Sequence, residues 1–256
     1  MEDILLYLVY KYEGDWAKIY QSIALHETVE EDELNRFRLL DKPPVVTILS
    51  ADYPVCFHQL ERPPYAIFYQ GDWSLMKEAF KVAVIGTRHA SAYGRKMTMQ
   101  LVSQLVQHEA VIVSGLALGI DGEAHRVALE AEGKTIAVLG YGLDQIYPYE
   151  HHLLKEEIGT KGLLLTEYPP GVPPRKEHFP MRNRLIAGVS QSVVVVESRI
   201  PSGTLSTVNY ALQYGKDVFC VPARADEGSG CNRLIQQGAI LVENVQDILE
   251  YSPRLL

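Results

Sequence analysis

Short runs of apolar, mostly β-branched residues alternate with amphipathic stretches over most of this chain. The runs begin at Val45, Tyr65, Val82, Val111, Thr135, Leu163, Ser192 and Asp217. Most are apolar at consecutive positions, which is typical of strands that are buried on both faces. The stretches between them, such as 94–109, repeat apolar residues at helical spacing. The alternation predicts an α/β protein with a Rossmann-like, doubly wound and mostly parallel sheet between layers of helices.

The first 44 residues follow a different pattern. Apolar residues recur there at helical spacing, at Leu5, Leu6, Val9, Ile19, Ile23, Leu34 and Phe37. The acidic run at 30–33 favours a helix start, and the two prolines after Lys42 end the helical pattern. We therefore predict a small helical domain over residues 1–44 and a Rossmann-like domain over residues 45–256.

The composition is that of an ordinary globular protein, with 47% hydrophobic and 22% charged residues among 256. No apolar run approaches the roughly 20 residues of a membrane span, and the acidic N-terminus differs from a secretory signal. We therefore expect a cytoplasmic protein without membrane contact. Its three cysteines, Cys56, Cys220 and Cys231, are widely spaced, and they are accompanied by neither a CxxC motif nor a His-x-x-x-His motif. Neither a disulfide framework nor a metal site is predicted, and no cofactor is expected.

Positive charge is concentrated in two segments of a chain whose net charge is −8. Residues 175–184 carry four basic residues and one acid, and residues 86–96 carry three basic residues and no acid. This concentration indicates a localised anion site. The alternative is a solvated loop whose basic residues pair with nearby carboxylates. Phe179 lies within the first segment, which we expect to be a loop. Fixed cations bind phosphates and an apolar ring stacks on a base, so this loop suits single-stranded nucleic acid. The alternative is that Phe179 packs against the rest of the protein and only holds the loop in place.

Two turns are expected at the carboxyl ends of strands, where doubly wound sheets bind ligands. Residues 86–88 read Gly-Thr-Arg and offer a tight turn, a hydroxyl and a guanidinium to an anion. Residues 202–204 read Ser-Gly-Thr and open a helix, so backbone N–H groups point to the same edge. The alternative for residues 86–88 is a turn glycine followed by a surface arginine. The alternative for residues 202–204 is simple N-capping of the helix. Neither a complete GxGxxG nor a GxxxxGK[ST] motif is present, which argues against a dinucleotide and excludes P-loop hydrolysis.

Ser114, Asp121 and His125 are the residues from which a hydrolytic triad could be built. Asp121 and His125 lie four apart at the predicted start of a helix, where an aspartate N-cap beside a histidine is a common structural pair. Nothing resembling a nucleophile elbow surrounds Ser114. We therefore assign no catalytic residue.

Ordered motifs in this chain resemble the DNA-processing protein A family, also called DprA or Smf. They are GTRHASAYG from Gly86, SGLALGIDGEAH from Ser114, AVLGYGLDQIYP from Ala137, KEHFPMRNRLIAGVSQSVVVVES from Lys176, SGTLSTVNYAL from Ser202 and GCNRLIQQGA from Gly230. The similarity extends over residues 45–249. The stretch 51–72 resembles the family's extended lead-in to the sheet, and the N-terminal helices look like a reduced form of its SAM-like domain.

The resemblance implies a non-enzymatic protein that binds single-stranded DNA entering a bacterium during natural transformation, protects it, and helps load the RecA recombinase. The family's DNA-contacting positions correspond here to Gly86, Thr87, Arg88, Lys176, Phe179, Arg182 and Asn183. The charge and helix-end arguments add Arg184, Ser202, Gly203 and Thr204. The family usually forms dimers through its C-terminal part, which implies a homodimer interface at Leu234, Ile235, Ile240 and Leu241. The alternative is that Ile235 and Leu241 are core residues.

Two other functions remain open at the level of sequence. A nucleotide phosphoribohydrolase of the lysine-decarboxylase-like group has a similar topology, and its PGGxGTxxE motif supplies a catalytic glutamate. The corresponding stretch here has Thr207 and Asn209 and no acid. A small-nucleotide sensor would need a closed pocket in place of an open groove.

Overall fold

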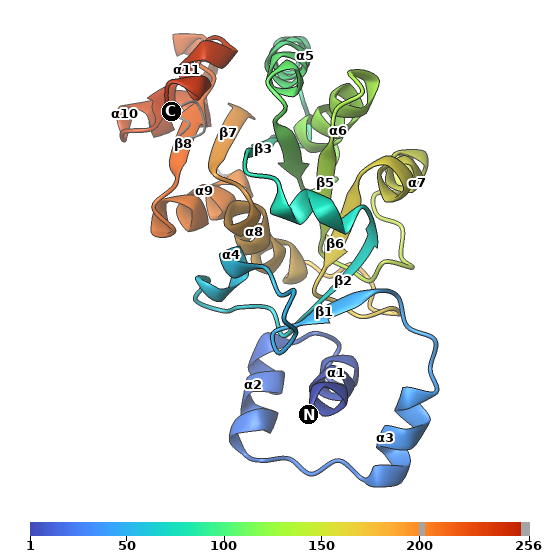
Figure 1. The fold of residues 1–256 in the computed structure, drawn as a ribbon. Coiled ribbons are helices and arrows are strands. Elements are labelled where there is room, and N and C mark those ends of the chain that lie inside the picture. The colour runs from blue at the N-terminus through green and yellow to red at the C-terminus, as the bar shows by residue number, and fades with distance from the viewer. Residues whose placement is uncertain (200–202, 252–256) are drawn as a thin grey trace.

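The computed structural model of the protein describes residues 1–199 and 203–251 and contains one mixed sheet (Figure 1). The strand order is β1-β2-β6-β5-β4-β3-β7-β8-β9. The strands are β1 (Val45–Thr47), β2 (Ala66–Gly71), β3 (Lys81–Gly86), β4 (Val111–Ser114), β5 (Thr135–Leu139), β6 (Leu163–Thr166), β7 (Ser192–Glu197), β8 (Asp217–Cys220) and β9 (Ile240–Leu241). All neighbours from β6 to β9 pair in parallel, whereas β1 and β2 add as antiparallel strands. The predicted Rossmann-like sheet is confirmed; the short β9 was not predicted.

Helices cover both faces of the sheet, as the alternation of apolar runs predicted (Figure 1). They are α1 (Glu2–Lys11), α2 (Trp16–Ala24), α3 (Glu31–Arg38), α4 (Val55–His58), α5 (Ala92–Gln107), α6 (Ile120–Glu130), α7 (His152–Lys161), α8 (His178–Val189), α9 (Thr204–Gln213), α10 (Gly230–Gln236) and α11 (Val245–Leu249). Successive residues of β3 point to opposite faces: Ala83 and Ile85 pack with α8 and α9, and Val82 and Val84 pack with α5 and α6. Strands buried on both faces explain the continuous apolar runs of the sequence.

The N-terminal helices α1, α2 and α3 lie at one end of the molecule, beside β1 and β2 (Figure 1). Their apolar residues, including Val9 and Phe37, belong to the same buried cluster as Phe68 of β2 and Leu139 of β5. The Tyr10 ring packs edge-on against Phe68 at 5.6 Å. The three helices thus share a core with the sheet, and the division of the chain at residue 44 stays a prediction.

The segment 175–184, predicted to be a loop, is helical from His178 onward, and this prediction was wrong. Proline is tolerated in the first turn of a helix, where its missing N–H has no intrahelical acceptor, so Pro180 does not interrupt α8. Leu185, Ile186 and Val189 are almost completely buried and hold the helix on the sheet. The helix therefore presents Phe179 and the residues after it from a rigid support.

The C-terminal residues expected at a dimer interface differ in exposure. Leu234 is 7% exposed and belongs to the core, so its assignment to a surface contact is corrected. Ile235 and Ile240 are partly buried against the core. Leu241, on the edge strand β9, is 43% exposed and remains available for contact with another molecule.

Candidate functional site

A cavity of about 700 Å³ opens at the carboxyl ends of the central strands. Its lining combines the end of β3, the first turns of α8 and the start of α9. The predicted residues that line it are Gly86, Thr87, Arg88, Lys176, Phe179, Arg182, Asn183, Gly203 and Thr204. Ser202 lies outside the described residues. Segments more than 100 residues apart in the chain therefore meet around one space, as the Rossmann topology requires.

The turn after β3 is held by contacts that exclude a side chain at Gly86. A Cβ there would lie 2.6 Å from Cγ1 of Ile120 and 2.8 Å from the carbonyl oxygen of Glu197. The Thr87 N–H donates to the Glu197 carbonyl at 2.8 Å, and the Thr87 carbonyl accepts from the Ile120 N–H at 3.1 Å. These bonds fix the turn between β7 and α6. Arg88, the next residue, is exposed at the cavity wall.

The Phe179 ring is half-buried and lies among cations. The guanidinium carbons of Arg88 and Arg182 are 5.6 Å and 5.9 Å from the ring centroid, within cation–π range. The Tyr147 ring packs against it at 5.5 Å with an interplanar angle of 35°. Tyr147, which is 38% exposed, therefore supports the ring from the side. The arrangement offers an aromatic surface next to two positive charges.

Arg182 holds its charge beneath the cavity, with 4% of its surface exposed. Its Nη1 donates to the Gly115 carbonyl at 2.7 Å and to the Val138 carbonyl, and Nε donates to Oδ1 of Asn183 at 3.0 Å. Burial lowers the pKa of this guanidinium and raises the pKa of the Asp121 carboxyl nearby. Gly115 leaves the space that the guanidinium fills, because a Cβ there would lie 2.6 Å from Nη2. Arg182 therefore acts chiefly as a fixed charge that positions the cavity wall.

Asn183 connects α8 to the start of α9. Its Nδ2 donates to Oγ of Ser206 at 2.7 Å, and that hydroxyl donates to the Gly203 carbonyl at 2.8 Å. Ser206 and Thr207 line the cavity as well, and neither was predicted, although both belong to the motif that supplied Gly203 and Thr204. Arg199 also lines the cavity and was missed, because nothing in the sequence separates it from other surface arginines.

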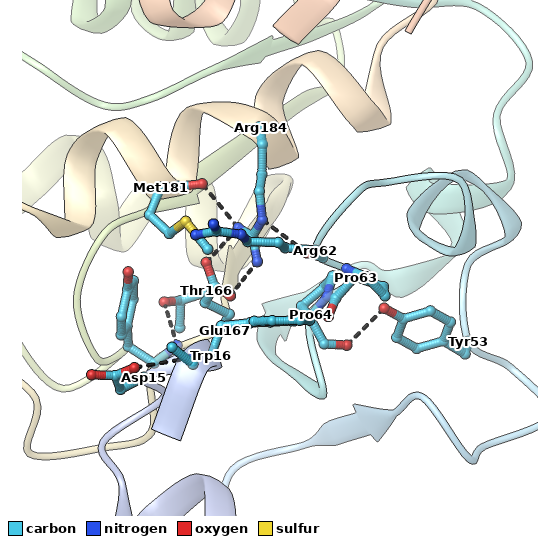
Figure 2. A network of polar contacts seen from close by, with 12 residues as sticks. Asp15, Trp16, Tyr53, Arg62, Pro63, Pro64, Thr166, Glu167, Met181 and Arg184 are labelled. Atoms are coloured by element: carbon cyan, nitrogen blue, oxygen red, sulfur yellow. Dashed lines mark hydrogen bonds and ion pairs between the residues drawn. The ribbon is translucent and has the colours of Figure 1, made fainter. Parts of the chain in front are cut away.

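Arg184 does not reach the cavity, and its assignment to DNA contact is corrected. Its side chain is 1% exposed and forms a two-bond ion pair with Glu167, with both N–O distances at 2.6 Å. Its remaining donors reach the carbonyls of Arg62 and Met181. Figure 2 shows the guanidinium between Glu167 and the lead-in residues 62–64. Arg184 lies two positions after Arg182 on α8, which is about 200° further around the helix axis. Its side chain therefore points away from the cavity and toward the lead-in.

Ser114, Asp121 and His125 do not form a triad. Oγ of Ser114 donates to the Val84 carbonyl at 2.7 Å, and Nδ1 of His125 pairs with Oγ1 of Thr135 at 2.6 Å. Oδ2 of Asp121 accepts from the Gly115 N–H at 3.2 Å. Burial lowers the pKa of His125 to about 3, so this ring stays neutral. The Ser114 bond joins β4 to β3, and the bonds of Asp121 and His125 hold α6 on the sheet.

Within residues 1–199 and 203–251, no group of three or more His, Cys, Asp or Glu side chains is placed to hold a metal ion. In the same part of the chain, no helix has the length and apolarity needed to cross a membrane.

Comparison with known proteins places this chain in a defined family. The model of the DNA recombination-mediator protein A family matches residues 44–253. The DNA processing protein DprA of Streptococcus pneumoniae is 44% identical over 230 residues, which cover 89% of this chain and 81% of the relative. The DNA processing protein DprA of Bacillus subtilis is 40% identical over 210 residues, covering 81% of this chain and 71% of the relative.

Solved structures give the same result. The X-ray structure of DNA processing protein A from Streptococcus pneumoniae superimposes with a TM-score of 0.81 at 41% identity, covering 92% of this chain and 80% of that one. A structure of the Helicobacter pylori protein, described for its unique single-stranded DNA binding mode, gives 0.75 at 35% identity, with coverages of 82% and 97%. The molybdenum cofactor binding protein of Rippkaea orientalis, at 18% identity and a TM-score of 0.50, shares the fold alone.

Proposed function

Because this chain belongs to the DNA recombination-mediator protein A family, we propose that its cavity binds single-stranded DNA. The observation that carries the proposal is the half-buried Phe179 ring beside the Arg88 guanidinium, with the exposed Lys176 on the same wall. An unpaired base stacks on an aromatic ring, and the adjacent cations meet its phosphates. The Helicobacter pylori relative, whose structure is described for single-stranded DNA binding, supports this assignment.

The binding is proposed to be tolerant of sequence and selective for unpaired strands. Stacking on Phe179 needs a base that is free of its partner, since a paired base is covered by its neighbours in the duplex. The described cavity wall offers rings and cations, which contact bases and phosphates and do not depend on the hydrogen-bond pattern of a major groove. Affinity would then come from the backbone and from stacking, which differ little among sequences.

The protein is proposed to act without catalysis. Asp121 is the one carboxylate in the described lining of the cavity, and it is occupied by the Gly115 N–H beneath Arg182. The first turns of α9, where a phosphoribohydrolase would carry its glutamate, present Ser206 and Thr207 instead. A buried carboxylate that already accepts a backbone hydrogen bond is poorly placed to stabilise an oxocarbenium-like charge.

Titration with three ligands tests the proposal. Fluorescence anisotropy would compare a labelled dT oligomer, a blunt duplex of the same length and a single nucleotide. We expect the oligomer to bind far more tightly than the other two. Equal affinity for the duplex and the single strand would refute the proposal. Preference for the single nucleotide, together with release of ribose phosphate from it, would favour the phosphoribohydrolase.

Protection of DNA that enters during natural transformation, loading of RecA and assembly as a homodimer are the finer parts of the proposal. Family membership supports them, and the exposed Leu241 on edge strand β9 offers a site for the dimer contact. A dimer would join two cavities, so that a longer strand bound by one is held close to the other.

A further inference from the structure

A second cavity, of about 670 Å³, lies at the opposite edge of the sheet from the candidate site. Lys81 opens β3, Gln191 directly precedes β7 and Lys216 directly precedes β8, and all three line it. The cavity thus sits at the amino ends of adjacent parallel strands, covered by residues of the lead-in. The length of the strands separates it from Phe179 and Arg88.

The lining of this second cavity carries unbalanced positive charge. Lys77, Lys81 and Lys216 all contribute to it, against Asp52 as its one described acidic residue. None of these lysines lies within 4.0 Å of a carboxylate oxygen in the part of the chain that the structure describes. Lys81 is only 5% exposed. Buried charges in proteins are normally paired with opposite charges, so this wall attracts an anion.

The three lysines differ in how many of their ammonium N–H groups are used in hydrogen bonds to backbone carbonyls. Lys216 donates to the Ala187 and Gly188 carbonyls at 2.7 Å each and to the Ser190 carbonyl, so its three N–H groups cap the end of α8. Lys81 donates to the Met76 carbonyl at 3.2 Å and to the Glu78 carbonyl, which leaves one of its three N–H groups. Lys77 is exposed. Burial lowers the pKa of Lys81 and lowers that of Lys216 to about 8, although the nearby Cys56 opposes both shifts and the Glu78 carboxylate opposes that of Lys81.

The rest of the wall combines apolar and aromatic side chains with the polar side chains of Gln59, Ser190 and Gln191. Tyr53, Val55, Trp73 and Met76 line it. Trp73 also packs against Tyr69 at 4.4 Å, which fixes the indole plane. A volume of this size with apolar walls and a few polar groups is typical of sites for small organic ligands.

We propose that this cavity binds a small organic anion, whose carboxylate or phosphate group meets Lys77 and Lys81 and whose flat apolar body lies against Trp73. The ligand is defined by this chemistry, which a nucleoside monophosphate and an aromatic carboxylate share. Binding does not depend on single-stranded DNA, because no residue lines both cavities. It should therefore persist in an Arg88→Ala variant.

Cys56 provides a local reporter, since it lines the second cavity and is half-buried, while Cys220 and Cys231 are buried. Its thiolate attacks the S–S bond of an aromatic disulfide, forms a mixed disulfide and releases the other half of the reagent as a thiolate. The absorbance of the released thiolate gives the rate. The dianionic dithiobis-nitrobenzoate would be compared with the neutral dithiodipyridine, and Cys56→Ser identifies the signal.

We expect Lys77→Met to slow the anionic reagent about two- to fivefold, the effect of one exposed charge, and to leave the neutral reagent unchanged. Lys96→Met removes an exposed lysine on α5 outside this cavity and serves as the matched control. Millimolar AMP or benzoate should slow the reaction of Cys56 with the neutral reagent, and the more effective one identifies the anionic group. The proposal is overturned if Lys77→Met behaves like Lys96→Met, or if neither anion protects Cys56.

Discussion

Replacing Phe179 by alanine separates the contribution of the aromatic ring to DNA binding from that of the surrounding charge. The ring is half-buried, lies 5.5 Å from the Tyr147 ring and has the Arg88 guanidinium at 5.6 Å. Loss of one stacked base costs about 1–3 kcal/mol, which corresponds to a roughly 5- to 150-fold weaker affinity for a dT oligomer. The substitution removes no charge, so the dependence of log K on log salt concentration should keep its slope.

The assay is anisotropy of a labelled dT oligomer over a series of salt concentrations. Two matched variants sharpen it: Phe179→Tyr keeps the ring and should bind like the unmodified protein, and Phe179→Leu keeps apolar volume against Tyr147 and should bind weakly. Wild-type affinity in Phe179→Leu would show that apolar packing, not stacking, matters. A salt slope altered as much by Phe179→Ala as by Arg88→Ala would refute the division between ring and charge.

The contact between Arg88 and Phe179 adds a coupling that a double-mutant cycle measures. Because the guanidinium lies within cation–π range of the ring, the two substitutions should deviate from additivity by about 0.5–1 kcal/mol. Phe179 with Lys176 serves as the control pair, for which the substitutions should add. Strict additivity in both pairs would mean that Arg88 and Phe179 act independently on the DNA.

Three further predictions concern charge, folding and assembly. Arg88→Ala and Lys176→Ala should each make the salt slope on a single strand shallower by about 0.7, and an unchanged slope would remove that residue from the phosphate contacts. Glu167→Gln should lower the free energy of unfolding by about 3–5 kcal/mol in denaturant titrations, because it leaves the buried Arg184 without its anion; a change below 1 kcal/mol would contradict this. Leu241→Arg should fold and give a monomer by light scattering, whereas Leu234→Arg should unfold by circular dichroism, and a folded Leu234→Arg protein would contradict the core placement of that residue.

The elements of the sheet and the grouping of its ligand loops could be predicted from the sequence. Residues buried on both faces produce continuous apolar runs, and parallel strands carry their loops to one edge, so Gly86, Phe179 and Gly203 were expected near one another. The short strand β9 was missed although it lies in the apolar run 239–242, because Ile240 and Leu241 were assigned to a dimer interface. The start of helix α8 was missed because its first turn contains Pro180 within a basic segment that follows a proline-rich break.

The roles of neighbouring arginines were decided only by tertiary structure. In the sequence, Arg182 and Arg184 are equivalent members of one basic segment. Once the segment is helical, two positions correspond to about 200° around the axis, so Arg182 turns beneath the cavity and Arg184 turns toward Glu167 and the lead-in. A sequence records how many charges a segment carries, but burial and the nearest partner determine which of them can meet a ligand, and both depend on residues distant in the chain.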